Sequence, residues 1–235
     1  MSKVPVFLIN RNRFTTTKTL SEWLLTIPEV SHVCILDNDS TYPPLLEWYA
    51  NLPDRVTVNL LKSNPVEAHQ IFWKLGMDKV VSKPYIVSDS DMVPAACCPK
   101  DLIARMITYS ERYRCQGYLK IGPSIRIDNL PDSPWKQAQI DSNLPNWEKR
   151  HGDTGAYISA IDTTFAIYRE GYGDAAYGHA LRLAWPYYFE HVPWYKWPMD
   201  DEEIYYLQHA SESSTFLWHV KHSCPEVLEK QIEVS

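Results

Sequence analysis

The sequence has no long apolar run, no surplus of basic residues and no paired cysteine motif. Its 235 residues include 23 lysines and arginines against 29 aspartates and glutamates, which gives a formal net charge of -6. Phosphate binding needs a basic face, so this balance argues against a nucleic-acid partner. No apolar run reaches membrane-spanning length, and residues 1–10 lack the pattern of a cleavable signal. We therefore expect no membrane span.

The cysteines indicate neither a disulfide framework nor a zinc site. Their number is odd, and none of them lies in a CxxC pattern. Reduced thiols are typical of a cytoplasmic protein, which is the location we expect. The five cysteines are Cys34, Cys97, Cys98, Cys115 and Cys224.

Aromatic residues are frequent, at 13% of the chain with nine tryptophans. Many of them lie in residues 183–198, which read LAWPYYFEHVPWYKWP. Aromatic faces suit sugar rings, but a packed core uses the same residues. Trp194 and Trp197 are therefore candidates either for a sugar platform or for core packing, within an irregular, aromatic-rich C-terminal portion.

The first part of the chain alternates between strand and helix patterns. Strands separated by helices of this length pair in parallel through right-handed crossovers. The sequence therefore predicts an α/β fold with a Rossmann-like, mostly parallel open sheet flanked by helices. The strands are expected at residues 4–9, 32–37, 55–61 and 84–89, and the helices at residues 15–27, 43–52 and 65–80.

The regular alternation ends near residue 100. A further helix is expected within residues 97–113. Residues 156–161 and 164–169 fit either two strands or one strand that bends near Asp162. The chain shows no repeat and no long linker, so we expect residues 1–235 to form a single domain.

Polar residues gather where the four predicted strands end. NRNR follows the first strand, DNDST the second, KSN the third and DSD the fourth. In open α/β sheets ligands bind beyond the carboxyl ends of the strands. Asp89 and Asp91 are two positions apart, so strand alternation directs both carboxylates to one face. Their repulsion favours a divalent cation there, although serine and aspartate also favour a simple turn.

Several segments occur in the order and spacing of a known enzyme family. They are VPVFLINRNR, ILDNDST, LLKSNP and YIVSDSDMVP, followed later by IDTTFAIYR, HVPWY and DDEEIYYLQHA. The chain resembles nucleotide-sugar-dependent glycosyltransferases of the GT-A fold, particularly the family 2-like group with a DxD motif. The resemblance implies that residues 1–100 bind the nucleotide and residues 101–235 the acceptor. It also implies transfer of a hexosyl or N-acetylhexosaminyl group from a UDP-sugar to a hydroxyl of a carbohydrate.

The resemblance also implies a metal site. Asp89 and Asp91 match the DxD motif, whose last carboxylate holds Mn2+ or Mg2+ on the donor diphosphate and whose first reaches the ribose or the metal. Such an ion stabilises the charge that grows on a departing diphosphate. His191 in FEHVPWY resembles the segment that supplies a third ligand, and imidazole is a reasonable ligand for Mn2+.

Further residues match the positions that contact the nucleotide in this family. Asp37 corresponds to the carboxylate that accepts the N3–H of uracil, and a carboxylate acceptor disfavours cytosine. Asn10 and Arg11 follow the first strand and are expected to contact the nucleotide. Arg13 and Arg182 are candidates for binding phosphate, with ordinary solvated arginines as the alternative.

The catalytic base has no clear match in the family pattern. An inverting transfer by direct displacement needs a carboxylate that takes the proton from the acceptor hydroxyl, and the missing match leaves inverting and retaining transfer as alternatives. Asp162 is the first choice because it interrupts an apolar stretch, where a carboxylate needs a partner. Asp153 and the acidic residues 200–203 are alternatives, although acidic residues also favour the start of a helix.

Two other function classes fit part of the pattern. A nucleotidyltransferase acting on a sugar phosphate also uses an α/β sheet with metal-binding aspartates, but that class usually has a glycine-rich loop after its first strand. Residues 10–18, NRNRFTTTK, contain no glycine. A non-catalytic carbohydrate-binding protein would explain the aromatic tail, but it needs no clustered carboxylates. A glycosyltransferase accounts for both the clustered carboxylates and the aromatic segment.

Overall fold

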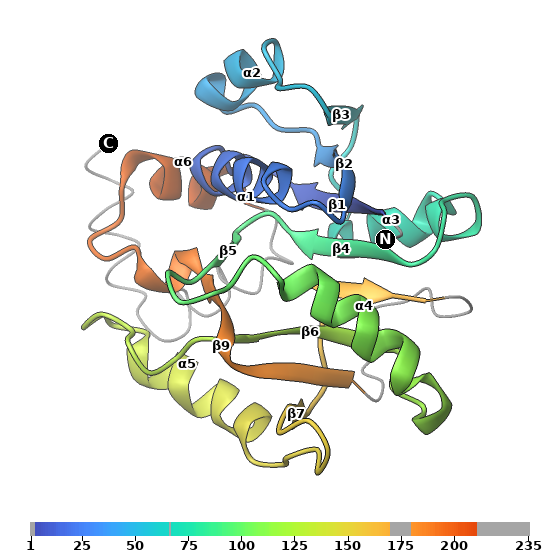
Figure 1. The fold of residues 1–235 in the computed structure, drawn as a ribbon. Coiled ribbons are helices and arrows are strands. Elements are labelled where there is room, and N and C mark those ends of the chain that lie inside the picture. Colours follow the sequence, from blue (N-terminus) through green and yellow to red (C-terminus); the bar gives the residue numbers. More distant parts are fainter. Residues whose placement is uncertain (1–2, 66, 170–179, 211–235) are drawn as a thin grey trace.

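A computed structural model describes residues 3–65, 67–169 and 180–210, which form one open sheet with helices packed against it (Figure 1). In these residues the sheet has nine strands; eight follow the order β3-β2-β1-β4-β8-β6-β9-β5, and β7 pairs with β9. The predicted open α/β sheet flanked by helices is confirmed. The strands are β1 (Val4–Asn10), β2 (Val30–Asn38), β3 (Val56–Leu61), β4 (Tyr85–Asp89), β5 (Met92–Pro94), β6 (Lys120–Ile125), β7 (Tyr157–Ile158), β8 (Ala166–Tyr168) and β9 (Ala180–His191), and the α-helices are α1 (Thr15–Leu25), α2 (Pro43–Tyr49), α3 (Ile71–Lys74), α4 (Leu102–Arg112), α5 (Lys136–Asn143) and α6 (Asp201–His209).

Strands β3, β2, β1 and β4 form the parallel part of the sheet. Every residue of β1 is buried, as expected for a strand that is covered on both faces. Helix α1 buries Leu20 and Leu24, which lie one turn apart on the same side of the helix. Because parallel strands end at the same edge, the polar residues that follow β1, β2 and β4 are brought together there.

The helix predicted at residues 65–80 is not continuous. It consists of a 3-10 turn at Ala68–Gln70, the single-turn helix α3 and a second 3-10 turn at Met77–Lys79. Gly76 has a φ of +66°, a left-handed conformation that a helix interior does not allow. Gly76 thus separates α3 from the second 3-10 turn, while Ala68 at the start of the segment lies beside the end of β2, where its carbonyl accepts from Asn38 at 3.5 Å.

The second half of the chain adds antiparallel pairs to the sheet. Strand β8 pairs antiparallel with both β4 and β6, whereas β6 pairs parallel with β9. Strand β7 pairs antiparallel with β9 and lies outside the main strand order. The sequences at residues 156–161 and 164–169 therefore contain two separate strands, β7 and β8, rather than one bent strand. Asp162 lies on the connection between them.

The aromatic segment is more regular than the sequence predicts. Residues Ala180–His191 form the long strand β9, and Val192–Tyr195 form a 3-10 turn. The irregular feature is a register shift, since Pro123 of β6 pairs with Leu183 but Ser124 pairs with Tyr188. Residues 184–187 are thus left out of the ladder, and Trp185 among them is 71% exposed.

The acidic residues at the start of α6 fasten this helix to the first half of the chain. Asp200 caps α6 by accepting the N–H of Glu203 at 2.9 Å, which confirms the predicted helix cap. Glu202 accepts the N–H groups of Phe14 and Thr15 at the start of α1, at 2.8 and 3.0 Å. Figure 1 shows α6 beside α1 as a result.

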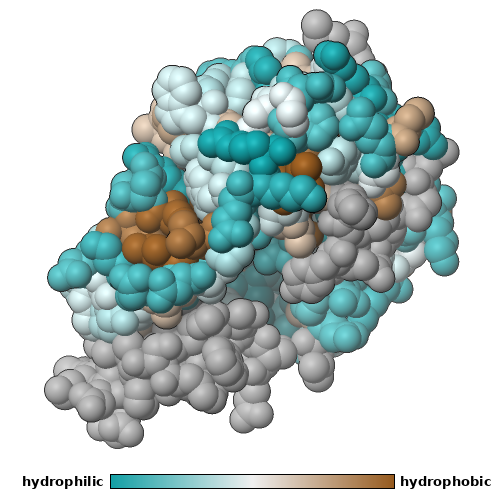
Figure 2. Space-filling view, turned by 90° about the horizontal axis from the view of Figure 1, so that it is seen from below, coloured by the Kyte–Doolittle hydropathy of each residue, from teal (hydrophilic) through white to brown (hydrophobic). Residues whose placement is uncertain are grey.

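The exposed surface has ordinary character. Seen from below, it is mainly hydrophilic, with a compact apolar patch framed by hydrophilic side chains (Figure 2). Across the described residues no helix has both the length and the apolar character needed to cross a membrane. Cys34, Cys97, Cys98 and Cys115 are free thiols, and Cys224 lies outside the described residues.

Candidate active site

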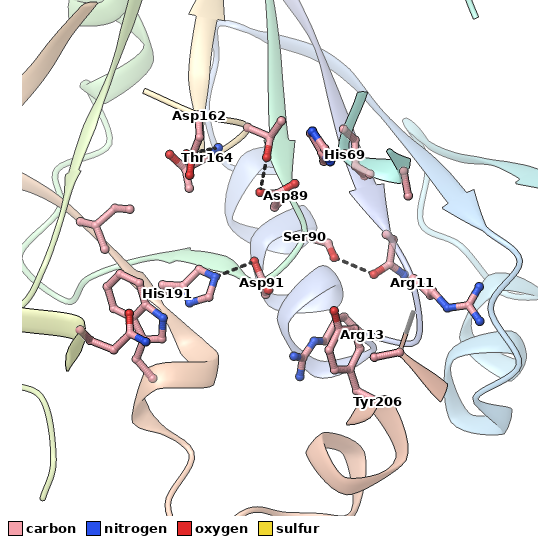
Figure 3. A pocket seen from close by; sticks show the side chains of 18 of the residues that line it. Arg11, Arg13, His69, Asp89, Ser90, Asp91, Asp162, Thr164, His191 and Tyr206 are labelled. Atoms are coloured by element: carbon pink, nitrogen blue, oxygen red, sulfur yellow. Dashed lines mark hydrogen bonds and ion pairs between the residues drawn. The ribbon is translucent and has the colours of Figure 1, made fainter. Parts of the chain in front are cut away.

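A cavity of about 670 Å³ opens at the carboxyl ends of β1 and β4 (Figure 3). The sheet register explains its position, because Ile9 of β1 lies opposite Asp89 of β4. The pairing of β1 with β2 likewise places Asn10 opposite Asp37. The predicted site residues that line the cavity are Asn10, Arg11, Arg13, Asp89, Asp91, Asp162, Arg182 and His191.

Asp89 ends β4 and is held by the chain that leads into β8. Its Oδ2 accepts the hydroxyl of Thr163 at 2.6 Å, and its N–H donates to the carbonyl of Thr163 at 3.0 Å. Burial, and then the nearby charge of Asp91, raise the pKa of Asp89 well above its usual range, while the Thr163 hydrogen bond acts in the opposite direction. This direction agrees with the repulsion expected between the two carboxylates of the DSD segment.

His191 reaches Asp91 because of the pairing between β5 and β9. This antiparallel pair places Met92 opposite His191, and the N–H of Val192 donates to the carbonyl of Asp91 at 3.0 Å. His191 Nε2 consequently lies 3.5 Å from Asp91 Oδ1, as the dashed line in Figure 3 shows. The structure thus brings together two predicted metal ligands that are far apart in the sequence.

These side chains fit a hard divalent cation. The atoms Asp91 Oδ1 and His191 Nδ1 are buried and make no hydrogen bond. Burying an unpaired carboxylate oxygen costs free energy, and a bound cation would offset that cost. In the described part of the chain no group of three or more His, Cys, Asp or Glu side chains is assembled as a complete metal centre. Ions such as Mg2+ are commonly held by one or two carboxylates together with substrate phosphates, and Asp91 and His191 beside Asp89 suit that arrangement.

Asp162 lines the cavity together with Arg182. Its Oδ1 accepts the N–H of Thr164 at 3.0 Å. The side chain is open to solvent within the cavity but closely surrounded by protein atoms, so burial still tends to raise its pKa. The Arg182 charge, the hydrogen bonds from Thr164 and the charge of His191 outweigh that effect and lower the pKa of Asp162. Asp162 is therefore ionised at neutral pH.

Arg182 is more buried than a phosphate-binding side chain at a surface. It is 5% exposed, and its Nε donates to the carbonyl of Ala160 at 2.9 Å. Burial lowers the pKa of Arg182, while the negative charge of Asp162 acts in the opposite direction. The Nε hydrogen bond of Arg182 is to the backbone, so Arg182 steadies the segment that leads to Asp162 and acts on that carboxylate through its charge. Diphosphate binding by Arg182 stays a prediction.

Asn10 in the cavity wall and Asp37 behind it belong to one hydrogen-bonded network. Asn10 Nδ2 donates to the Tyr49 hydroxyl at 2.7 Å, and Asn10 Oδ1 accepts the Ser90 hydroxyl at 2.6 Å. Asp37 is 1% exposed and does not line the cavity. Its carboxylate accepts the N–H and hydroxyl of Ser40 at 2.8 and 2.7 Å and the Tyr49 hydroxyl at 2.7 Å. A uracil ring would have to displace one of these donors to reach it, so direct base binding by Asp37 stays a prediction.

Both arginines after β1 contact α6, and Arg11 also contacts the end of β2. Arg11 donates to the backbone carbonyls of Asn38 at 2.8 Å and His209 at 3.1 Å. Arg13 forms a buried ion pair with Glu203, in which Nη2 lies 2.8 Å from Oε1 and Nη1 contacts Oε2. Burial by itself lowers the pKa of Arg13, but Glu203 more than offsets this and raises it. The contacts of Arg13 are those of a structural ion pair and do not support the predicted role in phosphate binding.

The carboxylates considered as bases are separated by the fold. Asp162 lines the cavity, whereas Asp153 is exposed and does not line it. The acidic residues 200–203 do not line the cavity either, because Asp200, Glu202 and Glu203 serve the helix cap, the start of α1 and the ion pair with Arg13. Asp162 is therefore the predicted base that the structure places in the site.

Sequence reasoning missed several residues of the cavity wall. His69 comes from the 3-10 turn that breaks the third predicted helix, and Figure 3 shows it on the same side of the cavity as Asp89. Tyr206 stacks beneath Arg13, with the guanidinium carbon 3.6 Å from the ring centre. A third group comes from α5 and the 3-10 turn after it. Its sequence signal was present, because Gln139, Ser142, Asn143 and Asn146 recur at helical spacing.

The chain has similarity to solved structures but not to known families by sequence. No protein-family model matches it, and neither does any curated protein. S. aureus TarS 1-349 in complex with UDP-GlcNAc is 15% identical, with 80% of this chain and 58% of that chain covered and a TM-score of 0.49. The mannosyltransferase PcManGT from Pyrobaculum calidifontis, solved with GDP-Man and Mn2+, is 10% identical over 80% of this chain and 56% of that chain, also at a TM-score of 0.49.

A third similar structure is glucosyl-3-phosphoglycerate synthase from Mycobacterium tuberculosis, solved with Mn2+, UDP-glucose and phosphoglyceric acid. It is 14% identical, with 72% of this chain and 57% of that chain covered and a TM-score of 0.42. This chain therefore spans less than two thirds of the length of each of these three proteins. At such identities and TM-scores, the roles of residues must come from the contacts within this chain itself.

Proposed function

We propose that this protein is a divalent-metal-dependent glycosyltransferase that moves a sugar from a UDP-sugar to a hydroxyl group of a carbohydrate acceptor. The observation that carries the proposal is the meeting of Asp89, Asp91 and His191 with Asp162 around one cavity. The cavity lies beyond the carboxyl ends of parallel strands, where open α/β sheets bind their ligands. Its volume of about 670 Å³ lies within the usual range of small-molecule sites.

Asp91 and His191 would hold the cation, with Asp89 beside them. When bound, Mn2+ or Mg2+ supplies positive charge that stabilises the diphosphate leaving group. Thr163 fixes the orientation of Asp89 through the 2.6 Å hydrogen bond, and Met92 and Val192 fix the spacing of Asp91 and His191 through strand pairing. This support from strands β4, β5 and β9 limits the movement of the charged groups.

Asp162 is the proposed catalytic base. It is ionised because Arg182 and the hydrogen bonds from Thr164 favour the charged form. As the acceptor oxygen forms its bond to the anomeric carbon and the bond to the diphosphate breaks, Asp162 takes the proton from the acceptor hydroxyl. The positive charge of Arg182 favours the ionised form of Asp162. We therefore expect Asp162 to release this proton readily after the transfer.

The preference for uridine rests on the end of β2. Asp37 holds Ser40 and Tyr49, and so it shapes the loop that follows β2 at the edge of the cavity. The resemblance to GT-A enzymes supports a uridine nucleotide with a hexosyl or N-acetylhexosaminyl group. Asp37 can favour this base through the loop that it holds, without giving up its own hydrogen bonds.

Thermal stabilisation tests the proposal directly. UDP with Mn2+ at about 100 times its Kd should stabilise the protein by about 2.7 kcal/mol, which raises the melting temperature by roughly 5–10 °C in a domain of this size. ATP with Mn2+, or free sugars alone, should have much smaller effects. Stabilisation by ATP but not by UDP would instead favour a nucleotidyltransferase, and stabilisation by sugars alone a carbohydrate-binding protein.

Turnover supplies the second part of the test. A screen of UDP-sugars that measures UDP release should show activity with Mn2+ or Mg2+ and none after chelation. Asp162→Asn should keep the stabilisation by UDP and Mn2+ but lose most acceptor-dependent release, since a general base contributes about 10²–10⁴-fold. Asp153→Asn, which changes an exposed carboxylate away from the cavity, is the matched control and should keep full activity.

A further inference from the structure

One wall of the cavity is built from uncharged polar side chains at helical spacing. Gln139, Ser142, Asn143 and Asn146 occupy positions i, i+3, i+4 and i+7 of α5 and the 3-10 turn that follows it, and all four line the cavity. Residues at this spacing lie on the same face of a helix. We call this surface the amide face.

The amide face differs from an ordinary solvated side of a helix. Gln139 is only 2% exposed, yet its Nε2 has no hydrogen-bond partner. Buried amide groups are normally paired, so this group calls for a partner that the described residues do not supply. On the outer side of the same helix, Gln137 is exposed and already bonded, since its Nε2 donates to Asp141 at 2.8 Å.

The amide face is fixed in position relative to the proposed reaction centre. At one end, Trp135 precedes α5, is fully buried and donates its indole N–H to the carbonyl of Trp194 at 3.2 Å. The ring of Trp194 lies 4.6 Å from that of His191. At the other end, Asn146 Oδ1 accepts the hydroxyl of Ser159, on the segment that leads to Asp162. The amide face therefore spans the distance between the proposed metal ligand and the proposed base.

The amide face carries no positive charge that would favour an anion. Its four side chains are uncharged, and Asp91 and Asp162 line the same cavity. The arginines of the cavity wall bond elsewhere: Arg13 pairs with Glu203, and Arg11 and Arg182 donate to backbone carbonyls. An acidic acceptor would therefore meet no cation on the amide face, whereas hydroxyl groups can both donate to and accept from amide and serine side chains.

We propose that the amide face binds a neutral, polyhydroxylated acceptor, namely a saccharide without phosphate, sulfate or carboxylate groups, and directs one of its hydroxyls to Asp162. The proposal rests on the proposed glycosyl transfer and adds the class of acceptor. Trp194 and Ile125, which also line the cavity, provide apolar contacts for the faces of a sugar ring. Gln139 supplies the central hydrogen bonds through its unpaired amide.

The test compares neutral and anionic glycans on one array, probed with the full chain in the presence of UDP and Mn2+. The array carries neutral oligosaccharides and matched forms with phosphate, sulfate or uronic acid groups. We expect binding to neutral glycans and none to their anionic counterparts. Binding to anionic glycans alone, or to no glycan at all, would overturn the proposal.

Variants of the amide face then locate the binding site. Gln139→Met keeps the size of the side chain but removes its hydrogen bonds, and should weaken binding of the best neutral glycan by about tenfold or more. Ser142→Ala changes an exposed residue of the same face, so it serves if the buried Gln139 variant does not fold. Gln137→Met, on the outer side of α5, is the matched control and should bind normally. Unchanged affinity in both variants of the amide face would overturn the assignment.

Calorimetry with UDP and Mn2+ separates this inference from the proposed function. Both amide-face variants should bind UDP and Mn2+ as the unchanged protein does, because the proposed nucleotide position is at the ends of β1 and β2, away from α5. If UDP and Mn2+ bind but neutral glycans neither bind nor stimulate UDP release, the acceptor proposal fails alone. If UDP with Mn2+ does not bind to the unchanged protein, the proposed function itself fails.

Discussion

The ends of β2 and β4 carry carboxylates in very different surroundings, although DND and DSD look alike in the sequence. Asp37 is 1% exposed and receives hydrogen bonds from Ser40 and Tyr49. Asp91 Oδ1 has no hydrogen bond and faces His191 at 3.5 Å. A carboxylate whose bonds are complete organises the loop around it, whereas one with an open oxygen can bind a cation. The same motif chemistry thus serves structure at the end of β2, and we propose that it serves ligand binding at the end of β4.

The difference arises from where the partners come from. The shortest hydrogen bonds to Asp37 come from the next twelve residues of the chain, in the loop after β2 and in α2, and only the longer 3.5 Å contact from Asn10 comes from another strand. The partner of Asp91 arrives on β9, and only because β5 pairs with the end of that strand. Replacing residues whose side chains are fully bonded within the protein should therefore mainly lower stability. Replacing residues with an open polar atom at the cavity should mainly weaken ligand binding.

The largest effect is expected on stability, when the buried ion pair between Arg13 and Glu203 is broken. Arg13→Met leaves the Glu203 carboxylate buried without a partner, because the two side chains are only 5% and 3% exposed. The free energy of unfolding should fall by about 3–5 kcal/mol. Urea denaturation measures this loss, and Arg13→Met combined with Glu203→Met should recover most of it. A single variant as stable as the unchanged protein would contradict a structural role for Arg13.

Asp91→Asn should have the next largest effect, and on turnover rather than stability. The amide keeps the shape of the side chain but removes the charge that faces the cation. We expect Mn2+-dependent UDP release to fall by about 10²–10³-fold. The melting temperature should change little, since Asp91 Oδ1 makes no hydrogen bond in the folded protein. Full metal-dependent turnover in the folded variant would remove Asp91 from the site.

His191→Ala tests whether β9 delivers a metal ligand or a packing residue. The variant should bind Mn2+ about 10–100-fold more weakly at fixed UDP, because the ion and the diphosphate bind as one unit. Uridine binding without metal should remain unchanged. His32→Ala, at an exposed position of β2 away from the cavity, is the matched control. A lower melting temperature with equal Mn2+ affinity would show that His191 only packs against Trp194.

Asp37→Asn completes the comparison with the smallest expected effect. Replacing the carboxylate by an amide weakens the hydrogen bonds from Ser40 and Tyr49, so the free energy of unfolding should fall by about 1–3 kcal/mol. The loss should appear in urea denaturation, together with a weaker preference for UDP over GDP and CDP. A large loss of Mn2+ binding in this variant would contradict the proposal that Asp37 stabilises the loop after β2 while Asp91 binds the cation.

Much of the fold and part of the site could be predicted from residue patterns. Alternating strand and helix patterns located β1 to β4 and α1, and the polar residues after these strands marked the carboxyl edge of the sheet. The acidic residues 200–203, which favour a helix start as well as a base, indicated the beginning of α6, and the structure identifies Asp200 as its cap. These features depend on contacts between residues that are close in the sequence, so local residue patterns predict them.

The sequence by itself determined the parallel half of the sheet, the pair of carboxylates at the end of β4 and the amide spacing of α5. Only the tertiary structure decided that His191 faces Asp91, that Arg13 is taken by Glu203 and that the amide face of α5 turns into the cavity. Each of these contacts joins segments that are far apart along the chain. They depend on the strand register of β5 and β9 and on the docking of α5 and α6, which are set by the packing of the whole sheet rather than by any local pattern.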